Sequence, residues 1–268
     1  MKAQYKIFLL AMLVLAVSSC KKYLDQIPDD TLTVEGVFDN SDNALRFLAN
    51  VYSNVPDEFN QRYVGGNSNA GAWTAASDEA DYQWNWVGSN YMNIGSWNSS
   101  SSFVQEFWQD DYNAIRSATF FMQNIDKVPS INMPDNLKVI YKNEARALRA
   151  IYYFYLVRIY GPIVIIGDEP IAVDAPTDLV QVPRNSMDEC IDYITKELDS
   201  AANNLPVVQA KTTDYGRITK PIALAFKARA LLLNASPLFN GNSDYAALKN
   251  LDGKQLINQT YDANKWKL

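Results

Sequence analysis

The chain has 268 residues, of which 48% are hydrophobic and 12% aromatic, and it carries a formal net charge of −6 without a single histidine. This length is sufficient for one large or two modest domains with a hydrophobic core. The absence of histidine excludes Ser-His-Asp and Cys-His nucleophile systems and histidine-based metal sites. The acidic balance, without a cluster of Lys or Arg, argues against binding of nucleic acid.

The first 19 residues have the pattern of a secretory leader. Lys2 and Lys6 supply a basic start, and the apolar run from Ile7 to Val17 is too short to span a bilayer comfortably. Ser18-Ser19-Cys20 completes a lipobox, so we expect residues 1–19 to be a lipoprotein signal peptide and Cys20 to carry lipid at the mature N-terminus. The alternative is an ordinary signal peptide with a cysteine nearby. Residues 20–40 are expected to form an extended, lipidated tether.

A first helix is predicted after the tether, followed by a long insertion. Ser41 is a suitable N-cap, apolar residues recur at helical spacing, and Pro56 ends the run. From Asn60 to Ser102 the sequence is rich in Trp, Asn and Gly and has no sustained period. Loops of this length are usually functional or disordered. Disordered segments are poor in aromatic residues, which favours an ordered loop here. Its tryptophans are Trp73, Trp84, Trp86 and Trp97.

Two helical hairpins follow this loop. The spacing of apolar residues predicts helices over 103–128 and from Pro134 to Tyr160, the second ended by Gly161-Pro162. Residues 163–182 contain prolines and are expected to form an extended covering segment or a short hairpin.

The second hairpin begins at a capping box formed by Ser186 and Glu189, and its first helix runs to Pro206. Thr219 is a predicted cap for the next helix, which covers 223–233. Cys190 falls on the apolar side of its helix, so we expect a small core residue rather than a reactive thiol.

The predicted fold class is therefore mostly α, with tetratricopeptide-like helical-hairpin repeats and a long Trp/Asn/Gly-rich loop insertion. The 34-residue consensus is not met, so the repeats are interpreted as degenerate. Residues 261–266 are expected to be the entry to another helix, close to the last residue, Leu268. A repeat stack without a polar cap exposes its last apolar face, which predicts a truncated chain.

Three segments together resemble one family. These are Cys20-Lys21-Lys22-Tyr23-Leu24-Asp25 followed by Pro28, residues 144–162 with Glu-Ala-Arg-Ala-Leu-Arg-Ala and Tyr-Gly-Pro, and residues 217–239 with Arg-Ile-Thr-Lys and Ala-Ser-Pro-Leu-Phe. In this order they are similar to SusD/RagB-type outer-membrane nutrient-binding lipoproteins.

The resemblance implies a helical protein with four repeat-like helix pairs, held by its lipid on the outer face of the outer membrane. It implies a partner, a SusC-like TonB-dependent transporter, to which captured oligosaccharides are delivered. Such proteins bind without catalysis and without a cofactor. Typical members are about twice as long, so 41–268 is expected to be an N-terminal helical repeat domain that lacks the C-terminal part of the family fold. An envelope scaffold that binds a protein or peptide is the alternative function.

Residues of the long loop have the side chains that carbohydrate binding requires. Sugar rings stack on flat aromatic faces, and their hydroxyls need amide or carboxylate partners at the edges. If the segment around Tyr82 is extended, its alternation places Tyr82, Trp84 and Trp86 on one side. Two of the four tryptophans are expected only to anchor the loop. The predicted ligand-binding residues are Trp73, Asp78, Tyr82, Trp84, Trp86, Asn90, Trp97 and Asn98.

Other polar residues are interpreted as structural. Asp78 and Glu79 are a carboxylate pair of the kind used in glycoside hydrolysis, but adjacent residues of an extended chain point to different sides, and hydrolysis needs convergence. A glycosidase is therefore the weakest of the functions considered. Arg146 and Arg149 are expected to pair with acids between helices or to cover apolar surface.

Overall fold

The structure is a computed structural model that describes residues 34–58, 72–172 and 174–267. The predicted signal peptide 1–19, the lipidation site Cys20 and most of the tether 20–40 lie outside the described residues. The chain divides into an N-terminal unit, which ends at Val37, and a main unit of residues 38–268. Helix α2 (Val34–Phe38) ends at the first residue of the main unit, and the following paragraphs describe the main unit.

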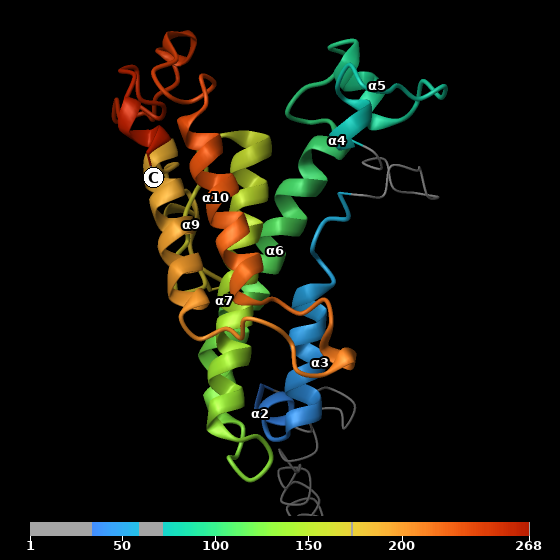
Figure 1. The fold of residues 1–268 in the computed structure, drawn as a ribbon. Helices are drawn as coiled ribbons and strands as arrows, with labels where there is room; N and C mark the ends of the chain where they lie inside the picture. Colours follow the sequence, from blue (N-terminus) through green and yellow to red (C-terminus); the bar gives the residue numbers. More distant parts are fainter. Residues whose placement is uncertain (1–33, 59–71, 173, 268) are drawn as a thin grey trace, which may run out of the picture. The chain divides into compact units, whose positions relative to one another are not determined.

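The main unit is built from helices. Its long helices α6 (Ser102–Asn124), α7 (Asp135–Tyr160), α9 (Met187–Ala202) and α10 (Lys220–Ala235) follow one another in alternating directions (Figure 1). In the part of the chain that the structure describes, the β-structure is a single antiparallel bridge between Lys249 and Gln255. The prediction of a mostly helical fold is confirmed. The shorter elements are α3 (Ser41–Tyr52), α4 (Ala72–Ala75), α5 (Gly88–Asn93), α8 (Thr177–Val180) and the 3-10 turns Ile125–Lys127, Thr212–Asp214, Ser243–Tyr245 and Ala263–Trp266.

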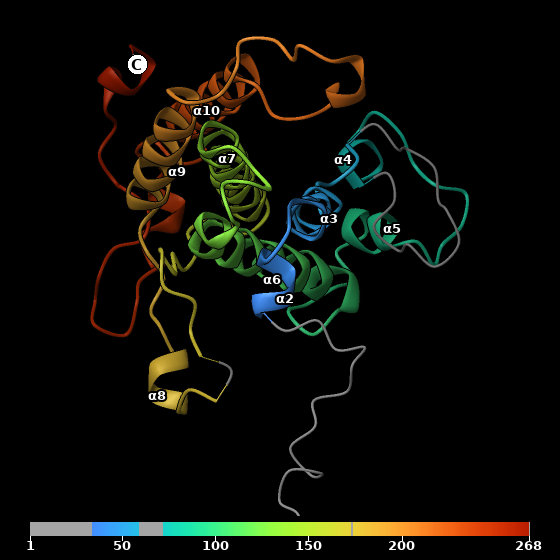
Figure 2. The ribbon, with the colours of Figure 1, turned by 90° about the horizontal axis from the view of Figure 1, so that it is seen from below.

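Helix α7 is the central helix of the main unit. It packs against α6 on one side and α9 on another, and α3 and α10 also contact it (Figure 2). Every residue from 147 to 157 is buried, which is the pattern of a helix surrounded by other elements. Gly161 ends it with a φ of +69°, a conformation that glycine adopts without strain. Pro134 immediately precedes the helix rather than lying within its first turn.

The helix starts agree with the predicted cap positions at α9 and α10 and differ at α3. The predicted capping box is present at α9, where Ser186 Oγ accepts from Glu189 N (3.3 Å) and Glu189 Oε2 accepts from Ser186 N (2.7 Å). At α3 the N-cap is Asn40 rather than Ser41, because Asn40 Oδ1 accepts the Asn43 N–H at 2.9 Å. Thr219 occupies the N-cap position of α10 but makes no side-chain capping bond.

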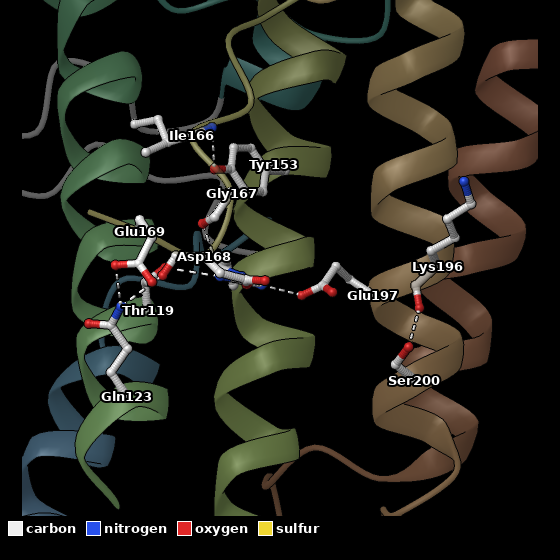
Figure 3. A network of polar contacts seen from close by, with 11 residues as sticks. Thr119, Gln123, Tyr153, Ile166, Gly167, Asp168, Glu169, Lys196, Glu197 and Ser200 are labelled. Carbon is white, nitrogen blue, oxygen red and sulfur yellow. Dashed lines mark hydrogen bonds and ion pairs between the residues drawn. The ribbon is translucent and has the colours of Figure 1, made fainter. Parts of the chain in front are cut away.

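Residues 163–182, predicted as an extended covering segment or a short hairpin and here called the covering segment, contain the short helix α8. A guanidinium fixes its root: Arg149, whose side chain is fully buried, donates to Gly167 O (3.2 Å), Asp168 Oδ1 (2.7 Å) and Thr119 Oγ1 (3.2 Å). The same group pairs with Glu197 on α9. Figure 3 shows these acceptors converging from α6, the covering segment and α9. The structural role predicted for Arg149 is confirmed.

Two further features concern predictions about single segments. Cys190 is fully buried with its Sγ 3.7 Å from Ile163 O, and burial raises the pKa of its thiol to about 11, which confirms the core assignment. Residues 263–266 form one 3-10 turn where the sequence predicts the entry to a helix. Among the described helices, none has the length and apolar character required to cross a bilayer.

Candidate functional site

The long loop is attached to the helices at one end by Trp73. Its ring lies on α4, half-buried, with centroids 5.9 Å from Phe107 and 6.2 Å from Tyr155. The guanidinium of Arg158 covers the ring at 4.1 Å from the centroid and also pairs with Glu58. Trp73 therefore has the anchoring position that was the alternative to a ligand platform.

Tyr82, Trp84 and Trp86 form a row of stacked rings, here called the aromatic ladder. The Tyr82 and Trp84 centroids are 6.3 Å apart with planes inclined by 16°, and those of Trp84 and Trp86 are 5.8 Å apart at 21°. The two tryptophan residues are 46% and 48% exposed. The predicted grouping of these three side chains is present in the structure.

The backbone of the ladder is bent rather than extended. Val87 N donates to Trp84 O at 3.4 Å, so the chain turns between the second and third rings. The residues after the turn, Val87 to Ser89, are buried and connect the ladder to α5. The rings thus align by stacking around a turn, whereas the sequence predicts alignment by the alternation of a strand.

The side chain of Asn90 fixes the backbone of the ladder. Its Nδ2 donates to Tyr82 O (2.8 Å) and to Trp84 O (2.7 Å), which fixes the carbonyls of two ladder residues with one side chain. A second amide, Asn93 Nδ2, donates to Ala75 O (2.8 Å) and ties α5 to α4. The Nδ2 of Asn90, a residue predicted to contact ligand, is therefore engaged with the loop backbone, while its Oδ1 is buried without a hydrogen-bond partner among the described residues. The scaffolding role of Asn93 was missed, because nothing in its sequence position marks it.

The remaining predicted residues are Trp97, Asn98 and Asp78, all of which are exposed. Trp97 is 48% exposed, and no ring stacking in the described parts of the chain joins it to the ladder. Asn98 Oδ1 accepts from Ser100 N (2.8 Å) within a turn. Asp78 is exposed. The structure therefore brings three of the eight predicted residues together as a surface, and a fourth, Asn90, supports them.

The chain matches a known family over most of its length. The profile of the SusD-like family, described as starch-binding and associating with outer membrane, matches residues 22–232. The chain belongs to the SusD-like family. This family consists of binding proteins, so the prediction that the chain is not an enzyme is confirmed. The family description also gives an association with the outer membrane.

Individual SusD-like relatives support the same assignment. A SusD-like protein of Bacteroides ovatus is 24% identical over 246 residues, which are 91% of this chain and 42% of the relative. SusD-like protein P38 of Formosa agariphila is 24% identical over 262 residues, 97% of this chain and 47% of that protein. The chain therefore spans less than half the length of these relatives.

Solved structures share this fold. BT4246 is 32% identical, with a TM-score of 0.71 over 85% of this chain and 38% of that chain. A laminarin-binding SusD-like protein superposes with a TM-score of 0.61 at 21% identity, over 74% of this chain and 41% of that one. The second similarity shows the fold alone.

The SusD-like sequence segments also contain a buried clamp that sequence reasoning missed. Glu144, 1% exposed, accepts from Tyr52 Oη (2.7 Å) and from Arg217 Nη2 (2.8 Å) and Nε (3.2 Å). Burial raises the pKa of the Glu144 carboxyl, against the opposing effect of Arg217. The motif containing Glu144 and the one containing Arg217 are both in the family resemblance, but only the structure shows that they meet.

Proposed function

We propose that this chain is part of a surface-exposed outer-membrane lipoprotein that binds oligosaccharides and delivers them to a SusC-like TonB-dependent transporter. The aromatic ladder carries the proposal, because rows of exposed rings are the surface on which sugar rings stack. The family description, which names starch binding, supports a carbohydrate ligand. One solved protein with this fold is described as laminarin-binding, so the fold is compatible with a glycan ligand.

The proposed binding surface consists of the ladder and three further exposed residues. The solvent-exposed parts of Trp84 and Trp86, which are 46% and 48% exposed, contact sugar rings, with Tyr82 as the third platform. Asp78 and Asn98 accept hydroxyl protons beside them, and Trp97 adds a separate platform. Trp73 and Asn90 act indirectly, by anchoring the loop and by fixing the ladder backbone.

The location and the repeat architecture are part of the same proposal. Lipid on Cys20, after removal of residues 1–19, anchors the protein to the outer membrane on its extracellular side. The hairpins α6–α7 and α9–α10 correspond to two degenerate tetratricopeptide-like repeats, which support the loop insertion. Residues 41–268 then form the N-terminal helical part of a longer protein.

Truncation of the ladder tests the proposal directly. Trp84→Ala and Trp86→Ala should each weaken binding to a retained glycan by on the order of tenfold, as expected when a central aromatic contact is removed. Affinity electrophoresis of this chain in gels containing neutral polysaccharides measures the loss. Incubation with the same glycans, followed by assay of reducing ends, should show no release.

Trp266→Ala is the matched control. Trp266 is exposed to the same degree, 51%, and lies in the 3-10 turn 263–266 outside the loop. This variant should bind like the parent. Equal binding by the ladder variants and the parent would overturn the placement of the site, and release of reducing ends would show an enzyme.

A protein-binding scaffold is the second candidate, and one observation favours it. A mostly apolar groove of about 460 Å³ lies along α10. Its lining includes Leu224, Leu231, Leu232 and Trp266, together with Lys227 and Lys265. Apolar surface of this kind is a common site of association between helices. Failure to bind any glycan, together with saturable binding of a helical peptide that Leu232→Gln abolishes, would favour this alternative.

A further inference from the structure

The aromatic ladder lies in a stretch of chain that has negative charge and no positive charge. From Trp73 to Ile115 the sequence contains no Lys or Arg. Asp78, Glu79 and Asp81 come directly before the first ring, and all three are exposed. We infer that the site selects uncharged glycans and rejects those that carry carboxylate or sulfate groups. This inference rests on the proposed function of the ladder.

The structure places one of these charges at the end of the ladder. Asp81 Oδ1 accepts the backbone N–H of Tyr82 at 2.8 Å, so its carboxylate is held against the backbone of the first ladder residue. Glu79 follows a turn in which Ser77 Oγ donates to Thr74 O (2.6 Å) and accepts from Glu79 N (3.3 Å). These bonds hold the backbone that carries the acidic residues just before the ladder.

Among the described residues, Arg158 brings a positive charge to this segment, at its anchored end. Arg158 lies over Trp73, 4.1 Å from the ring centroid, and its guanidinium is paired with Glu58. The ring that it covers is separated from Tyr82 by eight residues of chain. Its charge is thus engaged at the base of the loop, while the carboxylates adjoin the ladder itself.

Charge at this position affects neutral and acidic ligands in opposite ways. A sugar ring stacked on Tyr82 or Trp84 lies within about one screening length, ~8 Å at physiological salt, of the Asp81 carboxylate. A neutral glycan presents hydroxyl donors, which a carboxylate accepts in charge-assisted hydrogen bonds. An acidic glycan presents like charges, which the exposed carboxylates repel. The three carboxylates together predict that the acidic form binds roughly tenfold more weakly.

Comparing a neutral polysaccharide with its carboxymethylated form separates the effect of ligand charge on binding from the effect of ligand shape. Binding of this chain is measured to four neutral polysaccharides, laminarin, xylan, mannan and amylopectin, and to a carboxymethylated form of each. Any polysaccharide that binds should bind about tenfold more tightly than its carboxymethylated form at low salt, and the difference should shrink in 1 M NaCl, where screening reaches ~3 Å. Alginate and polygalacturonate, added as natural acidic glycans, should not bind.

A charge-removing variant assigns the effect to these residues. Asp78→Asn, Glu79→Gln and Asp81→Asn are combined, since each keeps the shape of the side chain and the amide introduced at position 81 keeps an oxygen for the Tyr82 N–H. The triple variant should bind neutral glycans within about threefold of the parent and lose most of the roughly tenfold discrimination. The control combines Asp178→Asn, Asp244→Asn and Asp252→Asn, three exposed acids outside the loop. It should keep the discrimination.

The outcomes are distinguishable from failure of the proposed function. If a ladder-dependent glycan binds as tightly in its carboxymethylated form, or if an acidic glycan binds best, the charge inference is wrong and glycan binding stands. Equal loss of discrimination in the two triple variants also overturns it. If no glycan binds, the proposed function fails and the charge inference fails with it.

Discussion

At the scale of single residues, Asp111 is a buried carboxyl group whose ionised form is destabilised. It lies on α6, only 3% exposed, and its Oδ2 has no hydrogen-bond partner among the described residues. Burial, with a smaller contribution from Asp110, raises the pKa of this carboxyl from 3.8 to about 8. The folded protein therefore holds a proton on Asp111 at neutral pH, and the unfolded chain does not.

This difference makes stability depend on pH. The pKa of Asp111 is higher in the folded protein than in the unfolded chain. Its contribution to the free energy of unfolding is therefore fully present below pH 4 and is lost as pH rises toward about 8. Above that pH, Asp111 is ionised in both the folded and the unfolded protein. Asp111→Asn removes this titration. From pH 5 to pH 9 the free energy of unfolding of the parent should therefore fall by on the order of a few kcal/mol relative to that of the variant. Urea unfolding at both pH values measures the difference.

Asp192→Asn is the control for this prediction. Asp192 is an exposed carboxylate on α9, so its replacement should change the free energy of unfolding by the same amount at pH 5 and at pH 9. Parallel curves for Asp111→Asn and the parent would show that Asp111 has an ordinary pKa.

The candidate site at this scale was partly predictable. Residue type and alternation were sufficient to group Tyr82, Trp84 and Trp86, because a short local pattern determines which side chains are neighbours. The functions of Trp73 and Asn90 were not predictable in the same way. Trp73 contacts Tyr155, which only the folded chain brings close. Asn90 contacts nearby residues, but its bonds depend on a turn that the alternation of residues does not indicate.

At the scale of elements, one buried guanidinium positions the covering segment. Arg149 connects α7 to α6, to α9 and to the root of residues 163–182. Gln123 on α6 adds a bond from its Nε2 to Asp168 O (2.8 Å) (Figure 3). A segment held by charge-assisted bonds at its root is expected to be protected there and more open towards α8.

Arg149→Met should lower the free energy of unfolding by about 3–5 kcal/mol, because it leaves Glu197, whose side chain is 14% exposed, without its partner. Amide hydrogen exchange of residues 163–171 should accelerate in the same variant. Chemical denaturation and exchange measured by mass spectrometry test both statements.

Lys142→Met is the control on the same helix. Lys142 pairs with Asp126, whose side chain is 60% exposed, so its loss should cost about 1 kcal/mol or less and leave exchange of 163–171 unchanged. A cost for Arg149→Met no larger than this control would show that the network contributes little.

The elements themselves were the most predictable part of the fold. The helices α6, α7, α9 and α10 have regular apolar spacing and clear end signals such as the capping box at Ser186, which are local properties of sequence. Asn40 replaced Ser41 as a cap because both residue types cap well and only the backbone decides between neighbours. Helices α4 and α5 are too short to produce a period, and they were not predicted.

At the scale of the whole main unit, the Glu144 clamp joins segments that are far apart in sequence. Tyr52 ends α3, Glu144 lies in α7, and Arg217 precedes α10, with Tyr52 Oη also accepting from Ile218 N (2.9 Å). The guanidinium of Arg217 stacks on Tyr141 at 4.5 Å. The clamp therefore connects α3 to the last hairpin through the central helix.

Glu144→Gln removes the charge while it keeps an oxygen for Tyr52. Arg217 then lacks its counter-ion in a partly buried position, so the free energy of unfolding should fall by about 2–4 kcal/mol. Guanidinium unfolding followed by circular dichroism measures this. Asp199→Asn, which breaks an exposed pair with Lys227, should cost less than about 1 kcal/mol. Equal costs for the two variants would contradict the importance of the clamp.

The buried thiol of Cys190 can report transient opening of the folded chain. The thiol is fully buried with a pKa raised to about 11, so a maleimide or disulfide reagent cannot reach a thiolate while α9 stays packed. In a Cys20→Ser chain, Cys190 is the one remaining cysteine. The rate at which it is labelled therefore measures how often the hairpins separate. A glycan that binds and stabilises the fold would slow that rate, so the same cysteine reports ligand binding without any added probe.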